Sequence, residues 1–307
     1  NTLGALATGG HAGRRAPFQP LLIDVDHIEA PYAYRLRGDG ESEEAFALRM
    51  ADLLDTEIRR IGPETVMAFV AEPVVGASLG TEPAPKGYFK RIREICDAHG
   101  VLYVADEVMC GMGRTGTLFA LEQEGIHADI MTMAKGLGAG YQPIAAVMAS
   151  EDVVAAIGAG SGTLWNGHTY MSHAVATAGA LAVQKIIEED NILDNVRQRG
   201  SRLEAALKAR LAQHAHVGDI RGRGLFWSVE LVADRQGKTP FPAERRVAQS
   251  VQGAAFKAGL MLYPAQGCAD GTNGDHILLA PSYLSSEAEI DQIVDGLDDA
   301  ISAGLAS

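Results

Sequence analysis

Short apolar runs alternate with amphipathic stretches through the first half of the chain. Each apolar run is too short for a buried helix, so these runs predict strands at 66–71, 101–105, 130–134 and 144–148. Apolar positions at helical spacing predict helices at 43–61, 86–99 and 118–124. Ser42 is the expected N-cap of the first helix, and Gly100 ends the second. Strands that alternate with helices indicate an α/β fold with a parallel sheet covered on both faces.

The second half of the chain has a different order of elements. Residues 172–213 have a helical pattern with a break near Asp190 and Asn191. Further strands are expected near 219–221, 226–232, 260–263 and 277–279, with helices at 243–258 and 287–303. This order is typical of a small α+β domain. We therefore expect a large domain at residues 1–194 and a small C-terminal domain at residues 195–307.

Composition narrows the class of protein. The 307 residues include 26 Lys+Arg and 39 Asp+Glu, which gives a net charge of −13 and argues against nucleic-acid binding. A hydrophobic content of 47% excludes a disordered or collagen-like chain. No apolar run approaches the ~20 residues that span a bilayer, and residues 1–15 lack the apolar core of a secretion signal. Three widely spaced cysteines form no disulfide framework, so we expect a cytoplasmic protein without membrane contact.

Three charged residues follow three of the predicted strands. Glu72 comes after the first strand, Asp106 after the second and Lys135 after the third. Any one of them alone is well explained as a strand-end charge that reaches solvent. Because parallel strands end at one edge of a sheet, where such folds bind ligands, all three are expected to converge there.

A lysine and a carboxylate at one sheet edge suit one cofactor in particular. Pyridoxal 5'-phosphate (PLP) needs a lysine that holds its aldehyde carbon as a Schiff base and an acid that keeps its ring nitrogen protonated. Lys135 lies on a glycine-rich turn and supplies the amine, and Asp106 supplies the acid. A lysine released from the cofactor can then carry a proton to and from the substrate carbon.

The same residues lie in segments that resemble the class III (ω-type) aminotransferases, which have PLP fold type I. Asp106 and Lys135 are 29 positions apart (135 − 106), as in that family. Five segments match in order, at residues 71–74, 104–116, 129–136, 167–170 and 221–225. The resemblance implies a large PLP domain whose mainly parallel sheet is flanked by helices, followed by the small domain.

The resemblance also assigns roles to individual residues. It implies that Lys135 forms the Schiff base, that Asp106 binds the pyridine nitrogen and that Glu72 lies on the substrate side. Val108 would pack against the cofactor ring. Thr169 would reach the phosphate of the neighbouring subunit, in a homodimer with shared active sites. No metal site is expected.

Some side chains in these segments have a simpler interpretation. Arg114 is better explained as a loop arginine that holds backbone carbonyls than as a substrate ligand. His168 is expected to be a hydrogen-bonded structural histidine. Trp165 lines the pocket mouth or packs at an interface, and the sequence does not decide between the two.

The chain departs from the family pattern in two places. Family members carry a phosphate-binding turn and a ring-stacking aromatic upstream of the position of Asn1, so a preceding segment is expected to be missing here. Many members that use α-amino acids carry an arginine before a proline pair in the small domain. The matching stretch, residues 278–282, reads Leu-Leu-Ala-Pro-Ser and offers no cation to bind an α-carboxylate.

Taken together, these features predict a PLP-dependent aminotransferase that moves an amino group from an ω-amino acid or amine to a keto acid such as pyruvate. Other enzymes with the same lysine and aspartate are an alternative, namely an aminomutase, racemase, decarboxylase or phospho-lyase. A cofactor-free fragment is another. A nucleotide-binding Rossmann protein is disfavoured, because the glycines of residues 136–140 have the wrong spacing for its phosphate-binding loop.

Overall fold

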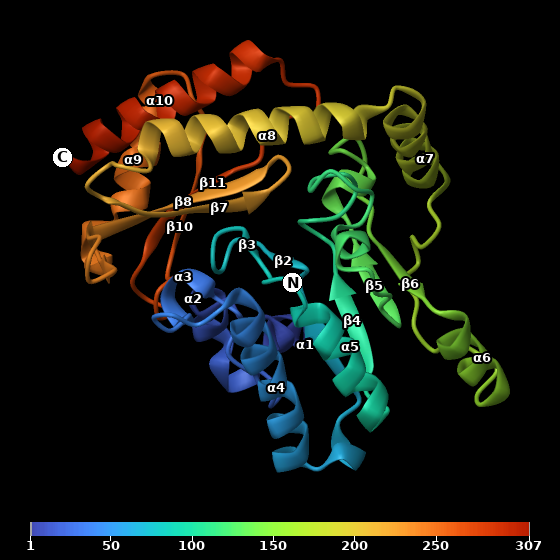
Figure 1. The fold of residues 1–307 in the computed structure, drawn as a ribbon. Coiled ribbons are helices and arrows are strands. Elements are labelled where there is room, and N and C mark those ends of the chain that lie inside the picture. Colours follow the sequence, from blue (N-terminus) through green and yellow to red (C-terminus); the bar gives the residue numbers. More distant parts are fainter. Residues whose placement is uncertain (1, 307) are drawn as a thin grey trace.

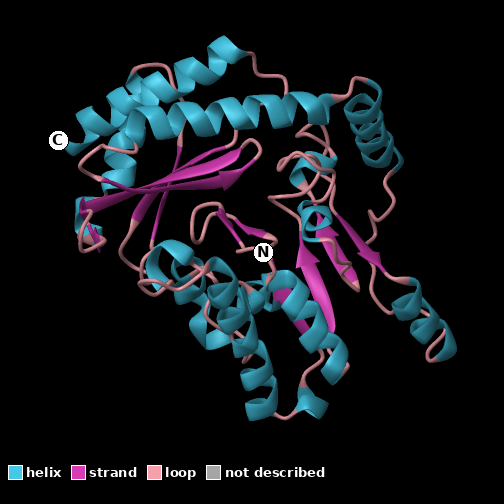
Figure 2. Cartoon of the chain, viewed as in Figure 1, coloured by secondary structure: helices cyan, strands magenta, loops and turns pink. Residues whose placement is uncertain are grey.

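The computed structural model describes residues 2–306 (Figures 1 and 2). The α-helices are α1 Leu3–Thr8, α2 Ala12–Arg15, α3 Ala33–Leu36, α4 Glu43–Ile61, α5 Tyr88–His99, α6 Glu151–Ala159, α7 Ala174–Glu189, α8 Ile192–Leu211, α9 Val247–Lys257 and α10 Glu287–Leu305. The strands are β1 Ala68–Ala71, β2 Val74–Val75, β3 Glu82–Pro83, β4 Leu102–Asp106, β5 Ile130–Met133, β6 Ala146–Ala149, β7 Val217–Arg223, β8 Phe226–Asp234, β9 Thr239–Pro240, β10 Tyr263–Gln266 and β11 Asp275–Leu279. Short 3-10 helices include η3 Ala120–Glu124 and η4 Lys135–Leu137.

The first sheet has the strand order β1-β4-β5-β6. Strand β4 is parallel to both β1 and β5, whereas β6 is antiparallel to β5. The α/β class and the mainly parallel sheet are therefore confirmed. Ser42 caps α4 through its side chain, and Gly100 ends α5 in the left-handed conformation, as expected.

This sheet is covered on one face only within residues 2–306. Helices α4 and α5 pack against that face with Phe69, Tyr103 and the η3 residue Leu121. On the other face Val70 is 42% exposed and Val147 is 70% exposed, so the expectation of two covered faces is wrong here. The connections from β1 to β4 and from β4 to β5 run in the same direction along the sheet. Because such crossovers are right-handed, both connections lie on the same side.

The second sheet is antiparallel and has the order β10-β11-β8-β7, with β9 beside β8. Helices α8, α9 and α10 supply the helical side of one continuous core, which includes Leu203, Val229 and Ile301. Seven consecutive residues of β8, Phe226–Val232, are buried, and Ser228 and Glu230 are the polar ones among them. This region matches the predicted α+β module.

Helix α8 connects the regions of the two sheets (Figure 1). It follows α7 after only two residues, and Asn191 makes the turn in the left-handed conformation at φ 52°. The predicted helix break is therefore confirmed. The predicted domain boundary after residue 194 falls in the first turn of α8 and stays a prediction.

Several elements differ from the sequence expectation. The strand predicted near 260–263 is present but begins later, because β10 starts only at Tyr263. Leu260 and Leu262 instead pack into the core, after Gly259 has ended the preceding helix at φ 86°. Helix α6 was not expected, although Ser150 caps it and two acidic residues follow. No helix within residues 2–306 combines the length and apolar character needed to cross a membrane.

Candidate active site

The three predicted strand-end residues lie at one edge of the first sheet. The register pairs Ala71 with Ala105 and Asp106 with Thr132, so β1, β4 and β5 end at nearly the same level. Glu72 follows β1, Asp106 ends β4, and Lys135 follows β5 after one residue. Glu72 lies close enough to the other two for both of their charges to act on its carboxyl group. The convergence expected from the sequence is therefore present.

Only one oxygen of Asp106 is used within the described chain. Its Oδ1 accepts hydrogen bonds from the Val108 amide (3.0 Å) and the Thr132 hydroxyl (3.2 Å). Its Oδ2 has no hydrogen-bond partner among residues 2–306. The side chain is thus oriented by one oxygen and offers the other as an acceptor.

Glu72 is held by the loop that follows it. Its Oε2 accepts a hydrogen bond from the Gly76 amide at 2.9 Å. Burial, followed by the nearby Asp106 carboxylate, raises the pKa of Glu72 to about 7, although the Gly76 amide and Lys135 oppose the shift. The carboxyl group therefore titrates near neutral pH, which suits a group that exchanges protons or adjusts to the charge of a substrate.

Lys135 lies on a strained turn and has a free side chain. Its φ is 42°, a left-handed conformation that is costly for a residue with a side chain. The neighbouring Gly136 lies against Met112, and a Cβ on that glycine would come within 2.8 Å of the Met112 Cβ. The Lys135 side chain is exposed, with no hydrogen bond or ion pair inside the described chain. Its amine is thus presented at the sheet edge without a competing partner.

Of the remaining predicted residues, Val108 lies at the sheet edge, whereas Thr169 lies in an exposed loop. Val108 is half-buried and lies beside Asp106, because its backbone amide donates the hydrogen bond to Asp106 Oδ1 described above. Thr169 lies in the loop between α6 and α7, where it is exposed, and no contact brings it to the strand ends. Trp165 and His168 are exposed in the same loop. The role of Thr169 depends on a second subunit and stays a prediction.

Arg114 has a structural environment. Its Nη1 donates to the carbonyls of Leu225 (3.0 Å) and Pro281 (2.6 Å). Its guanidinium lies 4.4 Å from the centroid of the Tyr283 ring, and burial lowers its pKa. The interpretation as an arginine that holds backbone carbonyls is confirmed, and Nη1 of this guanidinium is already engaged.

Two residues near the site were not singled out from the sequence. Thr132 shares a sheet face with Asp106, and period-two alternation around β5 could have identified it. Tyr283 donates to the Met112 carbonyl at 2.9 Å and so supports the turn under Gly136. No local pattern marks that contact, because the two residues are 171 positions apart.

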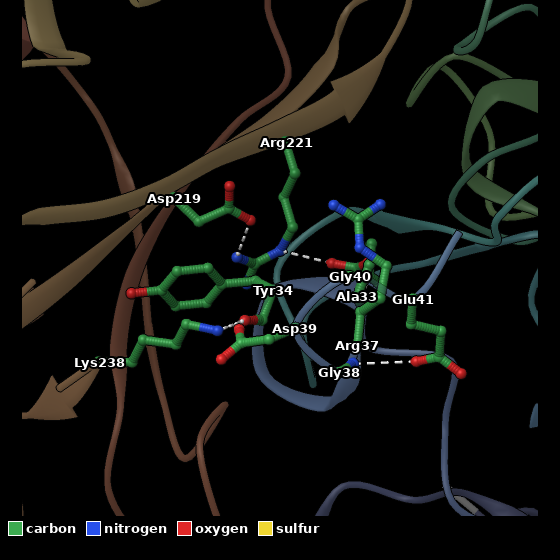
Figure 3. Close-up of a pocket in the computed structure, with 11 residues that line it drawn as sticks. Ala33, Tyr34, Arg37, Gly38, Asp39, Gly40, Glu41, Asp219, Arg221 and Lys238 are labelled. Atoms are coloured by element: carbon green, nitrogen blue, oxygen red, sulfur yellow. Dashed lines mark hydrogen bonds and ion pairs between the residues drawn. The ribbon is translucent and has the colours of Figure 1, made fainter. Parts of the chain in front are cut away.

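A cavity of about 700 Å³ lies apart from these residues (Figure 3). It opens between residues 33–41 and the second sheet, and Arg221, Asp219 and Lys238 contribute to its wall. Glu72, Asp106 and Lys135 do not line it. We therefore do not take this cavity as the site of the chemistry.

Comparison with known proteins places these observations in a family context. The family model described as aminotransferase class-III matches residues 1–301. An aminotransferase from Gibberella zeae is 46% identical over 308 residues, which cover 99% of this chain and 60% of that protein. The uncharacterized aminotransferase YodT from Bacillus subtilis is 38% identical, over 98% of this chain and 68% of that protein.

Solved structures agree with this match. An omega transaminase from Pseudomonas jessenii, in complex with PMP, has a TM-score of 0.90 and 35% identity. An (S)-enantioselective omega-transaminase from Thermomicrobium roseum has a TM-score of 0.90 and 34% identity. Each alignment covers 99% of this chain and 66% of the solved chain. The chain thus spans about two thirds of the solved chains, and 60% of the Gibberella zeae protein.

Proposed function

The chain belongs to the class-III aminotransferases, and from this premise we propose that the protein is a PLP-dependent aminotransferase that moves an amino group from an ω-amino acid or amine to a keto acid such as pyruvate. The reaction would run as two half-reactions at one site. The observation that carries the proposal is the convergence of an unpartnered Lys135 amine, a half-used Asp106 carboxylate and the Glu72 carboxyl group at one sheet edge.

The residues at this edge fit pyridoxal phosphate. Lys135 offers a free primary amine for the aldehyde carbon, and Asp106 offers the vacant Oδ2 for the protonated ring nitrogen. When bound, the cofactor supplies an electron sink for the negative charge that develops at the substrate carbon. Val108, beside Asp106, would pack on the ring, and Thr169 would reach the phosphate from the other subunit of a homodimer.

The chain's own residues then divide the work. Lys135 Nζ removes the proton from the carbon that carries the donor amine and returns it during the second half of the reaction. The anionic Asp106 keeps a proton on the ring nitrogen, which strengthens the electron sink. Glu72 lies on the substrate side of the site, and because its pKa is about 7 its carboxyl group can be neutral or ionised there.

The choice of donor rests on the absence of a carboxylate clamp in the small domain. Residues 278–282 contain no cation, and the Arg114 guanidinium nearby already holds the Pro281 carbonyl. An α-carboxylate would therefore lack the bidentate partner that such groups favour. The relatives named gamma aminobutyrate transaminase 3 from tomato, at 37% identity, and vanillin aminotransferase from Capsicum frutescens, at 38%, are consistent with this preference.

The test is spectroscopic and uses the full-length protein. A visible absorption band that borohydride bleaches, with the reduced adduct mapped to Lys135, is the expected result. A colourless protein that takes up no added PLP would favour the cofactor-free alternative. Adduct on another lysine would overturn the assignment of Lys135.

A donor panel with pyruvate as acceptor tests the reaction. Net amino transfer is expected, and its absence despite a Lys135 adduct would favour an aminomutase, racemase, decarboxylase or phospho-lyase. ω-Amines are expected to outperform α-amino acids in kcat/KM. If α-amino acids are better by tenfold or more, about 1.4 kcal/mol in the transition state, the proposed donor class is wrong.

A further inference from the structure

The loop from Glu72 to Glu82 is held at its tip by an arginine of the second sheet. Arg221, on β7, donates from Nε to the Gly80 carbonyl at 2.7 Å and from Nη2 to the Leu79 carbonyl. In return, the Thr81 hydroxyl donates to the Arg221 carbonyl at 2.9 Å. Arg221 also forms an ion pair with Glu82 at 3.0 Å. One side chain therefore fixes the backbone and the charge of the loop tip.

Arg221 is itself rigidly anchored. Its side chain is 6% exposed and forms ion pairs with Glu230 (2.7 Å) and with Asp219 (3.0 Å), the second of which is drawn in Figure 3. Glu230 is fully buried and also binds Arg35 and the Tyr32 hydroxyl. The guanidinium cannot leave the loop without leaving buried carboxylates uncompensated, which is costly.

The loop tip depends on this support because its backbone is strained. Gly80 has φ 75° and Thr81 has φ 42°, both left-handed. Gly80 also lies on the ring of the buried His276, where a Cβ would come within 2.7 Å of the ring Cδ2. The tip therefore has a defined position against the second sheet.

Gly76 transmits the position of the tip to the sheet edge. Its carbonyl accepts hydrogen bonds from the amides of Gly80 (2.9 Å) and Thr81 (3.2 Å), and its own amide donates to Glu72 Oε2 at 2.9 Å. A Cβ on Gly76 would lie 3.0 Å from the same oxygen, so the backbone is in close contact with the carboxyl group. A continuous set of hydrogen bonds thus leads from Arg221 to Glu72.

We propose that Arg221 is a positioning residue for the reaction, because it fixes the Leu79–Glu82 tip and, through Gly76, holds the Glu72 carboxyl group beside Asp106 and Lys135. This inference rests on the proposed function of that sheet edge. If the tip is released, the Gly76 amide separates from Glu72 and water reaches the carboxyl group. The substrate side of the site then loses its fixed acid, while Lys135 and Asp106 are left in place.

The experiment uses three variants of the full-length protein. Arg221→Lys keeps the positive charge but cannot bond two carbonyls and several carboxylates at once. Glu82→Gln removes the ion pair on the loop side and keeps the size of the side chain. Glu204→Gln is the matched control, because it makes the same change in an ion pair with Lys208 that includes neither Arg221 nor a residue of the loop.

Two readouts are independent of activity. In the first two variants, amide exchange at Gly76 is expected to rise by at least about tenfold. The pKa of Glu72, followed by carboxyl NMR, is expected to fall from about 7 by about one unit or more, because water entry removes the burial that is the largest cause of its rise and outweighs the loss of the Gly76 amide. The charged neighbours of this carboxyl group, Asp106 and Lys135, are unchanged in all variants.

Activity supplies the third readout. In the first two variants kcat/KM is expected to fall by about 10–100-fold while the borohydride adduct on Lys135 still forms. Glu204→Gln is expected to match the parent in all three readouts. Folded variants with parental Gly76 exchange and a parental Glu72 pKa would show that Arg221 is only a structural brace.

The design separates the two proposals. If Arg221→Lys does not fold, Glu82→Gln decides the outcome. If the parent forms no adduct on Lys135, the proposed function fails. The amide exchange of Gly76 and the pKa of Glu72 then still test the coupling from Arg221 to Glu72.

Discussion

Two groups of charged residues, each drawn from separate parts of the chain, differ in how far their bonds are satisfied. In the Arg221 group, the arginine has Glu82, Asp219 and Glu230 as counter-charges within 3.0 Å. At the sheet edge, Lys135 has no partner within residues 2–306, and Asp106 uses one of its two oxygens. Saturated charges build a rigid support, whereas charges left partly unsatisfied are available to a ligand. Residue type alone therefore does not distinguish a structural charged residue from a candidate catalytic one. The number of its hydrogen bonds and ion pairs within the protein does.

The largest expected effect comes from removing the unpartnered amine. Lys135→Ala should abolish the borohydride-trappable adduct and lower kcat by at least about 10⁴-fold, because it removes the amine that is proposed to move the proton. Stability should change by less than about 0.5 kcal/mol, since the side chain is exposed and forms no hydrogen bond or ion pair within residues 2–306. Turnover and denaturant unfolding measure both. A large loss of stability would show that Lys135 has a structural role like that of Arg221.

Asp106→Asn should have the next largest effect. The amide keeps a carbonyl oxygen for the Val108 amide and the Thr132 hydroxyl, so the fold should persist. Loss of the charge should slow proton removal by about 10²–10³-fold while the adduct on Lys135 still forms. Single-turnover kinetics with an amine donor measure this step. Turnover within a few-fold of the parent would make Asp106 a structural strand-end acid.

A substitution in the hydrophobic core beside the second sheet should lower stability and leave the cofactor spectrum unchanged. Leu203→Ala, in the buried core of α8, should lower the free energy of unfolding by about 2–5 kcal/mol. The absorption spectrum of the folded protein should remain that of the parent. Denaturant unfolding, with the spectrum recorded below the transition, checks both. A changed spectrum in the folded protein would mean that the core beside the second sheet affects the sheet edge that carries Lys135.

The smallest expected effect is a change in pH dependence. The folded-state pKa of Glu72 is about 7, above its ordinary value of 4.5, so the folded protein binds the extra proton between these values. The contribution of Glu72 to stability is therefore full below pH 4.5 and is lost as the pH rises through 7. It amounts to at most about 3 kcal/mol, and less where water reaches the carboxyl group.

Glu72→Gln should flatten the stability profile between pH 4.5 and 7. Denaturant unfolding over that interval gives the slope. Glu57→Gln is the matched control, because Glu57 lies on α4 and its pKa is lowered by Arg60. A parental slope in Glu72→Gln would show that this carboxyl group is ionised in the folded protein at pH 6.

Local signals predicted much of this architecture, since their physical cause lies within a few residues. Ser42 and Gly100 mark helix ends through their own backbone and side chain, and Asn191 marks the turn between two helices. The strand ends were found in the same way, because a charge directly after an apolar run disfavours a continued buried strand unless the charge is paired, as Glu230 is in β8.

Long-range pairing was not predictable in this way. The contacts of Arg221 with Leu79 and Gly80 span more than 140 positions, and no local pattern encodes them. The antiparallel direction of β6 and the uncovered face of the sheet depend on how the strands are ordered and connected, which no local pattern encodes. The left-handed backbone of Lys135 is likewise imposed by its surroundings, since lysine does not favour it.

Helix α8 has a consequence for which changes in length the protein can tolerate. Its 20 residues, from Ile192 to Leu211, span about 30 Å between the two sheets. Inserting one residue between Gly200 and Leu211 would move everything after it by about 1.5 Å and rotate it by about 100°. Gly200 would leave the backbone of Gly224, which it now meets so closely that even a Cβ would not fit. Homologous chains should therefore vary in length in their loops and keep the number of residues in this helix constant.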